Sequence, residues 1–182
     1  MATIISSLTT TQIAGLSSAS IAGLTTEDWA AFNTAQMAAL TTAQLPAMTT
    51  AGLAVLTSAQ FNAIGTEQFS VLTTRQAAAI TSTQTATMAT DDLQALSSAA
   101  IRTLSTTALA GMTSTQIGAF STSQVQALTT AQVRSLDSSD LNALTTSQVA
   151  ALTTGQVAAL TTTQISTMAT DDLGAIATSS IR

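Results

Sequence analysis

The feature that most restricts this chain is a period of eight residues that runs along it without insertion or deletion. Every eighth residue from Leu8 to Ile176 is large and apolar, which makes 22 consecutive octads. Two neighbouring octads read LTTSQVAA at 144–151 and LTTGQVAA at 152–159. A short, strict period is typical of an array in which each unit contacts only its neighbours. We therefore expect a stacked repeat and not a globule built around one pocket.

The other positions of the octad are restricted too, when they are numbered from that apolar residue. The sixth is large and apolar in 20 of 22 copies from Ile13 to Ile181, with Ala77 and Thr85 as exceptions. The third is Ser or Thr in all 22 copies, and the fifth is Gln in 13 and Asp in four. All 13 charged residues fall on the second, fourth, fifth or seventh position. Because charges avoid burial, we expect the first, sixth and eighth positions to face inward and the third hydroxyl to have a fixed partner.

A short helix that restarts in every octad fits this pattern better than one long helix. In a continuous helix the apolar stripe would rotate by about 80° per octad. In a restarted helix the sixth position and the next first position are three residues apart and share a face. Two hydroxyl positions precede this helix, and Thr145 with Gln148 has the spacing of a capping box. The third position is the more regular of the two, which favours it as the cap. We predict about six helical residues per octad and two that turn the chain.

A β-solenoid is the alternative, because in–out alternation from the sixth to the third position also fits a strand. Its corners would fall on Ala-Gln or Ser-Gln pairs, and the chain has only eight Gly and three Asn. Ala, Gln and Leu favour helices. The predicted fold is all-α: a solenoid or superhelix of very short capped helices, one per repeat. Since a six-residue helix is unstable alone, neighbouring octads must cover it.

An 80-residue period, ten octads long, lies above the first. The sequence TMATDDL occurs at 87–93 and 167–173, and LSSASIAGL at 16–24 is echoed by LSSAAIRTL at 96–104. No linker interrupts the array, so we treat residues 1–182 as a single continuous domain.

Neither end carries the polar, divergent octad that normally closes a solenoid. We expect either a piece of a longer array or open ends that stack head to tail into a filament, with the chain itself as partner. The only proline, Pro46, falls on a seventh position, which we expect to be exposed.

Composition excludes several function classes. The net charge is −5, with four Arg and no Lys, which argues against nucleic-acid and anionic-membrane binding. Without Cys or His, thiolate and imidazole metal sites are excluded. No stretch of about 18 apolar residues occurs, and the first residues lack the basic start and apolar core of a classical signal peptide. We expect no membrane span, no cofactor and no metal.

The only candidate chemical groups are three pairs of adjacent acids at the fourth and fifth positions. Negative charge is favourable at a helix start, so we interpret them as caps; a weak calcium site and acid–base catalysis are the alternatives. Since His, Cys, Lys and Tyr are all absent, no nucleophile–base pair can form, and we predict that the chain is not an enzyme. The pairs are Glu27/Asp28, Asp91/Asp92 and Asp171/Asp172.

Other distinctive residues have simpler interpretations. Trp29 occupies a sixth position, so we expect core packing, with a ligand platform as the alternative. Arg102 and Arg182 lie one 80-residue period apart, and we expect them at the solvated surface; Arg182 pairing with an acidic residue of a following subunit is the alternative. Five methionines fall on core positions and are expected to pack there: Met37, Met48, Met88, Met112 and Met168.

The LTTAQV sequence at 128–133 and the LTTxQVAAL pattern at 144–160 resemble the octapeptide arrays of large bacterial secreted or surface proteins, which are often adhesin-like. This resemblance implies an extracellular structural or adhesive role, with export that uses no N-terminal signal. LTTxQVAAL is also similar to the first helix of TAL-effector repeats, which is a capped helix. The chain lacks their base-reading loop and basic charge, so this second resemblance supports a helix and not DNA binding.

From these observations we expect an extracellular structural protein: a filament subunit, a spacer or a surface stalk. One alternative is a binding module whose rows of hydroxyl groups recognise a flat, regular surface such as ice or polysaccharide. Another is a solenoid that binds a protein in a concave groove. That function needs a surface stripe of aromatic or charged residues, which the sequence does not show.

Overall fold

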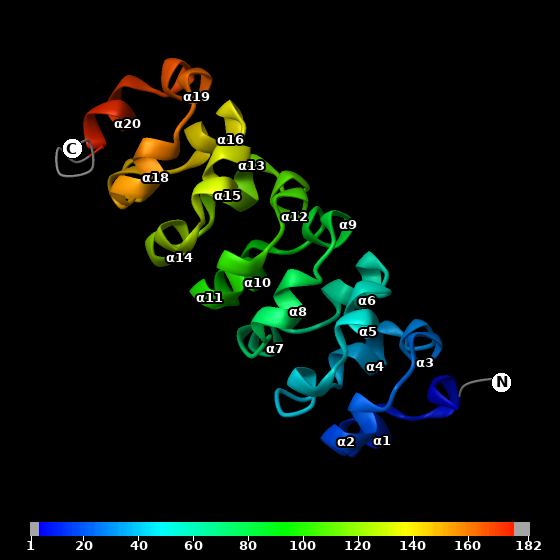
Figure 1. Cartoon of the computed structure of the whole chain (residues 1–182). Coiled ribbons are helices and arrows are strands. Elements are labelled where there is room, and N and C mark those ends of the chain that lie inside the picture. Colours follow the sequence, from blue (N-terminus) through cyan, green and yellow to red (C-terminus); the bar gives the residue numbers. More distant parts are fainter. Residues whose placement is uncertain (1–3, 177–182) are drawn as a thin grey trace.

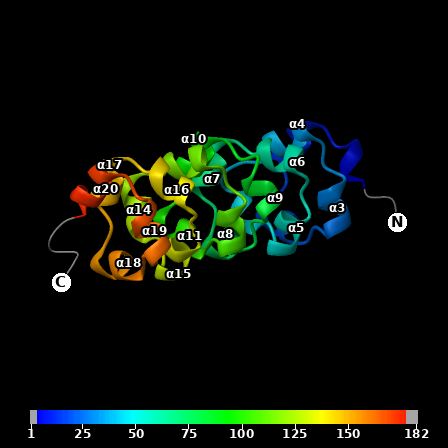
Figure 2. The ribbon, with the colours of Figure 1, turned by 90° about the horizontal axis from the view of Figure 1, so that it is seen from above.

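The computed structural model describes residues 4–176, which form a superhelix of short helices wound along one axis (Figure 1). The chain advances steadily from blue to red, and a view turned by 90° shows the blue helices and the red helix α20 toward opposite ends of the rod (Figure 2). Within these residues the elements are α-helices of four to six residues and two 3-10 turns, without a strand. The predicted all-α solenoid is confirmed, and the β-solenoid alternative is wrong.

Each octad contributes one element. Their bounds are η1 Ile5–Ser7, α1 Thr10–Ala14, α2 Ser18–Ala22, α3 Thr26–Ala30, α4 Thr34–Ala38, η2 Leu45–Ala47, α5 Thr50–Ala54, α6 Ser58–Asn62, α7 Thr66–Ser70, α8 Thr74–Ala78, α9 Ser82–Thr85, α10 Thr90–Ala95, α11 Ser98–Thr103, α12 Thr106–Ala110, α13 Ser114–Gly118, α14 Thr122–Ala127, α15 Thr130–Ser135, α16 Ser138–Ala143, α17 Thr146–Ala150, α18 Thr154–Ala159, α19 Thr162–Thr167 and α20 Thr170–Ala175.

Helix α15 shows how the octad folds. Thr129 is extended, and its hydroxyl accepts the backbone N–H of Gln132, whose side chain accepts the N–H of Thr129 in return. After the helix, Leu136 is extended again (φ −66°, ψ 138°) and turns the chain into the next octad. The capping box predicted at Thr145 and Gln148 is likewise present.

The prediction that the third position is the cap is wrong. The cap is the second position, and the third begins the helix, because a capping box places the cap three positions before the glutamine. Helices α7, α10 and α20 follow Gly65, Ala89 and Ala169, which have no side-chain acceptor for this role. Pro46 is exposed, as expected. It has no N–H to donate, and its octad forms the 3-10 turn η2 in place of a helix.

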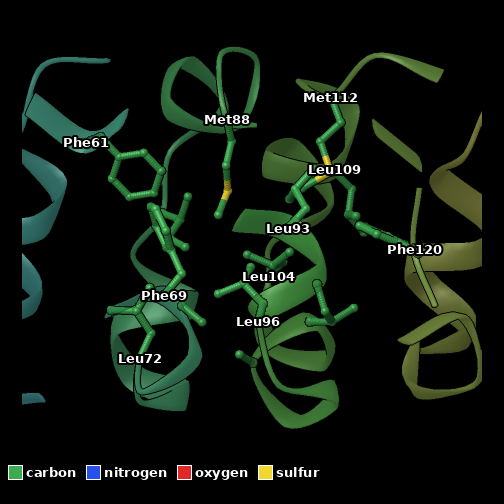
Figure 3. Close-up of a cluster of buried hydrophobic side chains, with 14 of the residues drawn as sticks. Phe61, Phe69, Leu72, Met88, Leu93, Leu96, Leu104, Leu109, Met112 and Phe120 are labelled. Atoms are coloured by element: carbon green, nitrogen blue, oxygen red, sulfur yellow. The ribbon is translucent and has the colours of Figure 1, made fainter. Parts of the chain in front are cut away.

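The side chains of the first and sixth positions form one apolar core that extends from Ile5 to Met168. Figure 3 shows its middle, where Phe61, Phe69, Leu93 and Leu109 gather between successive turns. Helices pack against the helix three octads along, as α7 does with α10, α8 with α11 and α13 with α16. Hydrogen bonds between residues 28 and 31 apart also join the turns. One superhelical turn therefore takes between three and four octads.

The inward-facing set agrees with the prediction only in part. The eighth position is half-buried in most octads and packs at the edge of the core, as at Ala31 and Ala95, whereas Val55 is exposed. The fifth position, which we expected to avoid burial, is buried in most octads, and Gln132 is 2% exposed. The third is exposed in most octads, and some of its hydroxyls donate to another turn, as those of Ser18 and Ser58 do. No helix within residues 4–176 is both long enough and apolar enough to cross a bilayer.

Candidate functional site

The most frequently repeated polar feature is a row of buried fifth-position glutamines that join successive turns. Gln132 accepts the N–H of Thr129 at 2.7 Å through Oε1. Its Nε2 donates to the backbone carbonyls of Ile101 at 3.0 Å and Leu104 at 2.8 Å. These carbonyls lie at the C-terminal end of α11, where helices leave carbonyls with spare acceptor capacity; that of Ile101 also accepts the N–H of Leu104. One side chain thus closes its own helix start and binds the preceding turn, with both amide hydrogens used.

We call this arrangement the glutamine clasp: Oε1 on the cap N–H, and Nε2 on the carbonyls 28 and 31 residues earlier. We did not predict the clasp from the sequence, because we interpreted the fifth position only as part of a cap. The available signal was that Gln fills this position in 13 octads, whereas other residues close capping boxes equally well. Clasps with both carbonyls are made by Gln36, Gln44, Gln60, Gln76, Gln84, Gln116, Gln124, Gln132, Gln156 and Gln164.

Aspartate at the fifth position uses a different partner, because a carboxylate accepts hydrogen bonds and cannot donate to carbonyls. Asp92 accepts the hydroxyl of Thr66 at 2.6 Å, and Asp172 accepts that of Thr146 at 3.2 Å. These two contacts are one 80-residue period apart, so the long period of the sequence is also a period of contacts. Asp140 accepts the hydroxyl of Ser114 at 3.0 Å in the same way.

Burial raises the pKa of Asp92 and of Asp140, because desolvation of the carboxylate outweighs the hydroxyl hydrogen bond that lowers it. Both side chains are less than one-tenth exposed. Each of the two serves as a contact between turns.

The three acidic pairs therefore divide in role. Asp28 accepts both the N–H and the hydroxyl of Thr25, which confirms the capping interpretation for that residue. Asp92 and Asp172 lie in the first turn of α10 and α20, where negative charge is favourable, but the preceding alanines form no capping box and both carboxylates reach across to another turn. Their neighbours Glu27, Asp91 and Asp171 are exposed. No three acidic side chains within residues 4–176 gather into a group able to hold a metal ion.

Trp29 is a core residue with 0% exposure, so its alternative role as a ligand platform is wrong. Its ring stacks on Phe32 with centroids 4.8 Å apart. Gly52, at a fifth position, makes room for it: a Cβ there would lie 2.4 Å from Cδ1 and 2.5 Å from Nε1 of the indole. The indole takes space that a clasp glutamine needs, and its N–H forms no hydrogen bond within the described residues.

The outer surface consists mainly of the small residues of the third, fourth and seventh positions. Arg102 is exposed, as expected, and Arg182 lies outside the described residues. A groove lies beside the 3-10 turn η2, and Pro46, Thr49, Thr73 and Arg75 are among the residues that line it. The five core methionines are buried as predicted.

A sequence model of the ALTTAQ repeat matches the chain at residues 5–42, 29–66, 37–74, 85–122, 109–138 and 133–170. The hexapeptide itself occurs at 39–44 and 127–132, where it covers the eighth to the fifth position of consecutive octads and ends on the clasp glutamine. Residues 75–84, which include the small core residue Ala77, lie between the matches. The comparison with curated proteins gives no match, and that with solved structures gives none either.

Proposed function

The chain belongs to the ALTTAQ repeat family, and we propose that this repeat protein is a structural rod that holds two points a fixed distance apart, as an extracellular spacer or stalk. The observation that carries the proposal is the glutamine clasp. Clasps recur from Gln36 to Gln164, so they connect turns along most of the length of the rod.

The clasps make extension and bending costly. Pulling Gln132 away from the preceding turn leaves its Nε2 and the carbonyl of Leu104 without a hydrogen-bond partner in a buried environment, and the carbonyl of Ile101 with only the N–H of Leu104. Each such buried group costs about 1–3 kcal/mol. Because the clasps act in parallel with a continuous apolar core, a local opening of one turn is disfavoured by several groups at once.

The shape test is duplication of residues 87–166 after residue 166, which keeps the octad register and the 80-residue period. We expect the same helical content per residue and a longest dimension that increases in proportion to the added length, measured by small-angle X-ray scattering. A matched control duplicates residues 87–170, which shifts the register by half an octad and should lose helical content. An in-register duplication that leaves the longest dimension unchanged would overturn the rod.

The extracellular placement is supported by the resemblance to arrays of bacterial secreted and surface proteins. The test is protease treatment of intact cells that produce the protein, with a cytoplasmic marker as control. Cleavage of the protein while the marker survives supports surface exposure. Equal protection of the two would exclude it.

A second candidate function is binding to a flat, regular surface such as ice or polysaccharide. It is favoured by the exposed third-position hydroxyls, such as those of Thr122, Thr130 and Thr162, which recur in most octads. Thermal hysteresis and sedimentation with crystalline polysaccharide test it directly. Replacing exposed third-position threonines by valine keeps the size of the side chain and should abolish either activity.

A further inference from the structure

The groove beside the 3-10 turn η2 lies between two successive turns of the superhelix. Its lining comes from within residues 46–50 on one turn and from residues 73–76, at the start of α8, on the next. Its volume is about 580 Å³, inside the range of ~300–1,000 Å³ that is typical of small-molecule sites. The groove is therefore large enough for a ligand of the size of one or two sugar rings.

The buried part of the lining is fixed by a clasp. Gln76 and Met48 are 2% and 3% exposed. Gln76 accepts the N–H of Thr73 at 2.9 Å and donates to the carbonyls of Leu45 at 2.7 Å and Met48 at 2.9 Å. Because this clasp joins the two turns that line the groove, the groove is held in shape before any ligand binds.

The exposed part of the lining offers hydrogen-bond donors that are free. Arg75 is exposed, and its guanidinium forms no ion pair or hydrogen bond within residues 4–176. The hydroxyls of Thr50 and Thr74, which also line the groove, form no hydrogen bond with the described part of the chain either. A ligand can therefore bind these groups without breaking any contact of the fold.

The missing clasp beside Trp29 frees one more donor. The hydroxyl of Thr73 donates to Gln76 at 2.9 Å, as cap hydroxyls do in several octads. At the corresponding place after Thr49 stands Gly52, which has no side-chain acceptor, so the Thr49 hydroxyl accepts the N–H of Gly52 at 3.0 Å and keeps its own hydrogen available. The space that the indole requires thus leaves a free hydroxyl donor in the groove.

The charge of the groove is positive, in contrast to the net charge of −5 of the whole chain. Arg75 lines it and no acidic residue does. A second cation lies on the next turn: Thr103 donates to the carbonyl of Thr74 at 3.0 Å, so Arg102, the residue before Thr103, lies beside this contact. Arg102 is exposed and has no ion pair within residues 4–176. Two unpaired guanidinium groups on adjacent turns favour an anionic ligand.

The chemistry of the groove favours one class of anion. The planar guanidinium matches a carboxylate, and free hydroxyls match the hydroxyls of a sugar. A densely charged polymer such as nucleic acid is repelled by the acidic chain, and the lining has no aromatic ring on which a base can stack. Carboxylates that are separated by uncharged sugar atoms avoid most of this repulsion.

We propose that this groove binds a carboxylated sugar of an acidic polysaccharide. Arg75 holds the carboxylate, the hydroxyls of Thr49, Thr50 and Thr74 bind the hydroxyls of the sugar, and Arg102 contacts the carboxylate of a following sugar. This inference goes beyond the proposed spacer or stalk, because it gives the rod a ligand. The site is local, so its test does not depend on the shape of the rod.

The test is isothermal titration calorimetry of the full chain with a short oligogalacturonate at about 0.15 M salt, where distant charges are screened. The native chain should bind saturably, with a dissociation constant of about 1 mM or lower. The methyl ester of the same oligomer lacks the negative charges and should not bind. Absence of saturable binding up to about 10 mM would overturn the proposal, and equal binding of the methyl ester would overturn the role of the carboxylate.

Four variants locate the site. Arg75→Gln should weaken binding at least about tenfold, and Arg102→Gln about threefold. Thr50→Val combined with Thr74→Val keeps the size of both side chains and should weaken binding about threefold or more. Arg134→Gln is the matched control, because Arg134 is exposed but does not line the groove, and it should leave the affinity unchanged. Far-ultraviolet circular dichroism should be the same for all four variants, since the altered side chains are exposed.

Three outcomes contradict the assignment. Equal weakening by Arg75→Gln and Arg134→Gln would show that overall charge and not the groove attracts the oligomer. Unchanged affinity of the double threonine variant would remove the sugar-binding role of the hydroxyls. Inorganic phosphate that binds as tightly as the oligogalacturonate would show a general anion site and overturn the sugar as its ligand.

Discussion

Two neighbouring contacts between turns are built differently. Where residues 113–136 pack on the turn before them, Gln116, Gln124 and Gln132 all make clasps. One turn earlier, the three consecutive fifth positions are Asp92, Ala100 and Ala108, and no glutamine reaches back to residues 61–80. The same octad thus packs with and without its main polar contact.

The contact without clasps is joined by hydroxyl groups. Thr66 donates to Asp92, Thr103 donates to the carbonyl of Thr74 at 3.0 Å, and Thr85 donates to that of Ala108 at 2.7 Å. Thr85 is one of the two sixth positions without a large apolar residue, and this hydrogen bond accounts for its burial.

The contact without clasps is also packed by other means. Phe61 and Phe69 meet edge to face there, with centroids 5.1 Å apart, and line the region drawn in Figure 3. Gly111 allows a close approach of backbones, because a Cβ there would lie 2.6 Å from the carbonyl oxygen of Ser82. Where clasps are absent, several neighbouring residues therefore differ together: hydroxyl donors, an aromatic pair and a glycine take over the contact between the turns.

The largest expected effect comes from charging a clasp. Gln124→Glu places a carboxylate against the carbonyls of Leu93 and Leu96, and we expect a loss of about 3–5 kcal/mol in the free energy of unfolding at neutral pH. Urea unfolding followed by circular dichroism measures it. Gln12→Glu changes an exposed glutamine that makes only the capping contact with Thr9, so it should cost far less; an equal loss in both variants would contradict the clasp.

Removing a clasp should cost less than charging one. Gln132→Ala leaves two carbonyls and one cap N–H without their side-chain partner, and we expect a loss of about 2–4 kcal/mol. Amide hydrogen exchange should show faster opening around Ile101 and Leu104 and unchanged protection near Phe61. Uniform acceleration along the chain would show that the clasp is not a local contact.

The pair Trp29 and Gly52 tests why one clasp is missing. Gly52→Gln should cost about 2–3 kcal/mol, because the new side chain meets the indole. In the Trp29→Leu background the same change should be nearly neutral, since space for the amide returns. A double-mutant cycle with a coupling energy below about 0.5 kcal/mol would show that the two sites are independent.

The buried aspartates predict a pH dependence of stability. Because the pKa values of Asp92 and Asp140 are raised, the folded state binds more protons than the unfolded state above the ordinary aspartate pKa. Their contribution therefore becomes less favourable as the pH rises through that window, and more favourable on acidification. Asp92→Asn with Asp140→Asn should remove this component and raise stability at pH 7 by on the order of 1 kcal/mol. Identical pH profiles of native chain and variant would contradict this.

The smallest effects concern the caps. Thr129→Ala should cost about 1 kcal/mol, because the N–H of Gln132 loses its acceptor. Ala89→Thr adds a missing cap before α10, in the contact without clasps, and should stabilise the chain by about 0.5–1 kcal/mol. Thermal unfolding measures the change in stability of both variants. If Ala89→Thr stabilises the chain by as much as Gln132→Ala destabilises it, caps do not contribute less than clasps and our ranking is wrong.

The sequence by itself determined the local structure of this protein. Its period set one element per octad, the spacing from Thr145 to Gln148 predicted the capping box, and the apolar residues of the first and sixth positions identified the core. These are local properties, decided within a single octad. Only the tertiary structure decided the number of octads per turn and the role of the fifth position. The acceptors of Gln132 lie 28 and 31 residues earlier, and nothing in one octad shows which distant carbonyls the superhelix will bring to it. For the same reason we did not place the fifth position among the inward-facing ones. Burial of this polar side chain costs little, because its own octad satisfies Oε1 and the preceding turn satisfies Nε2.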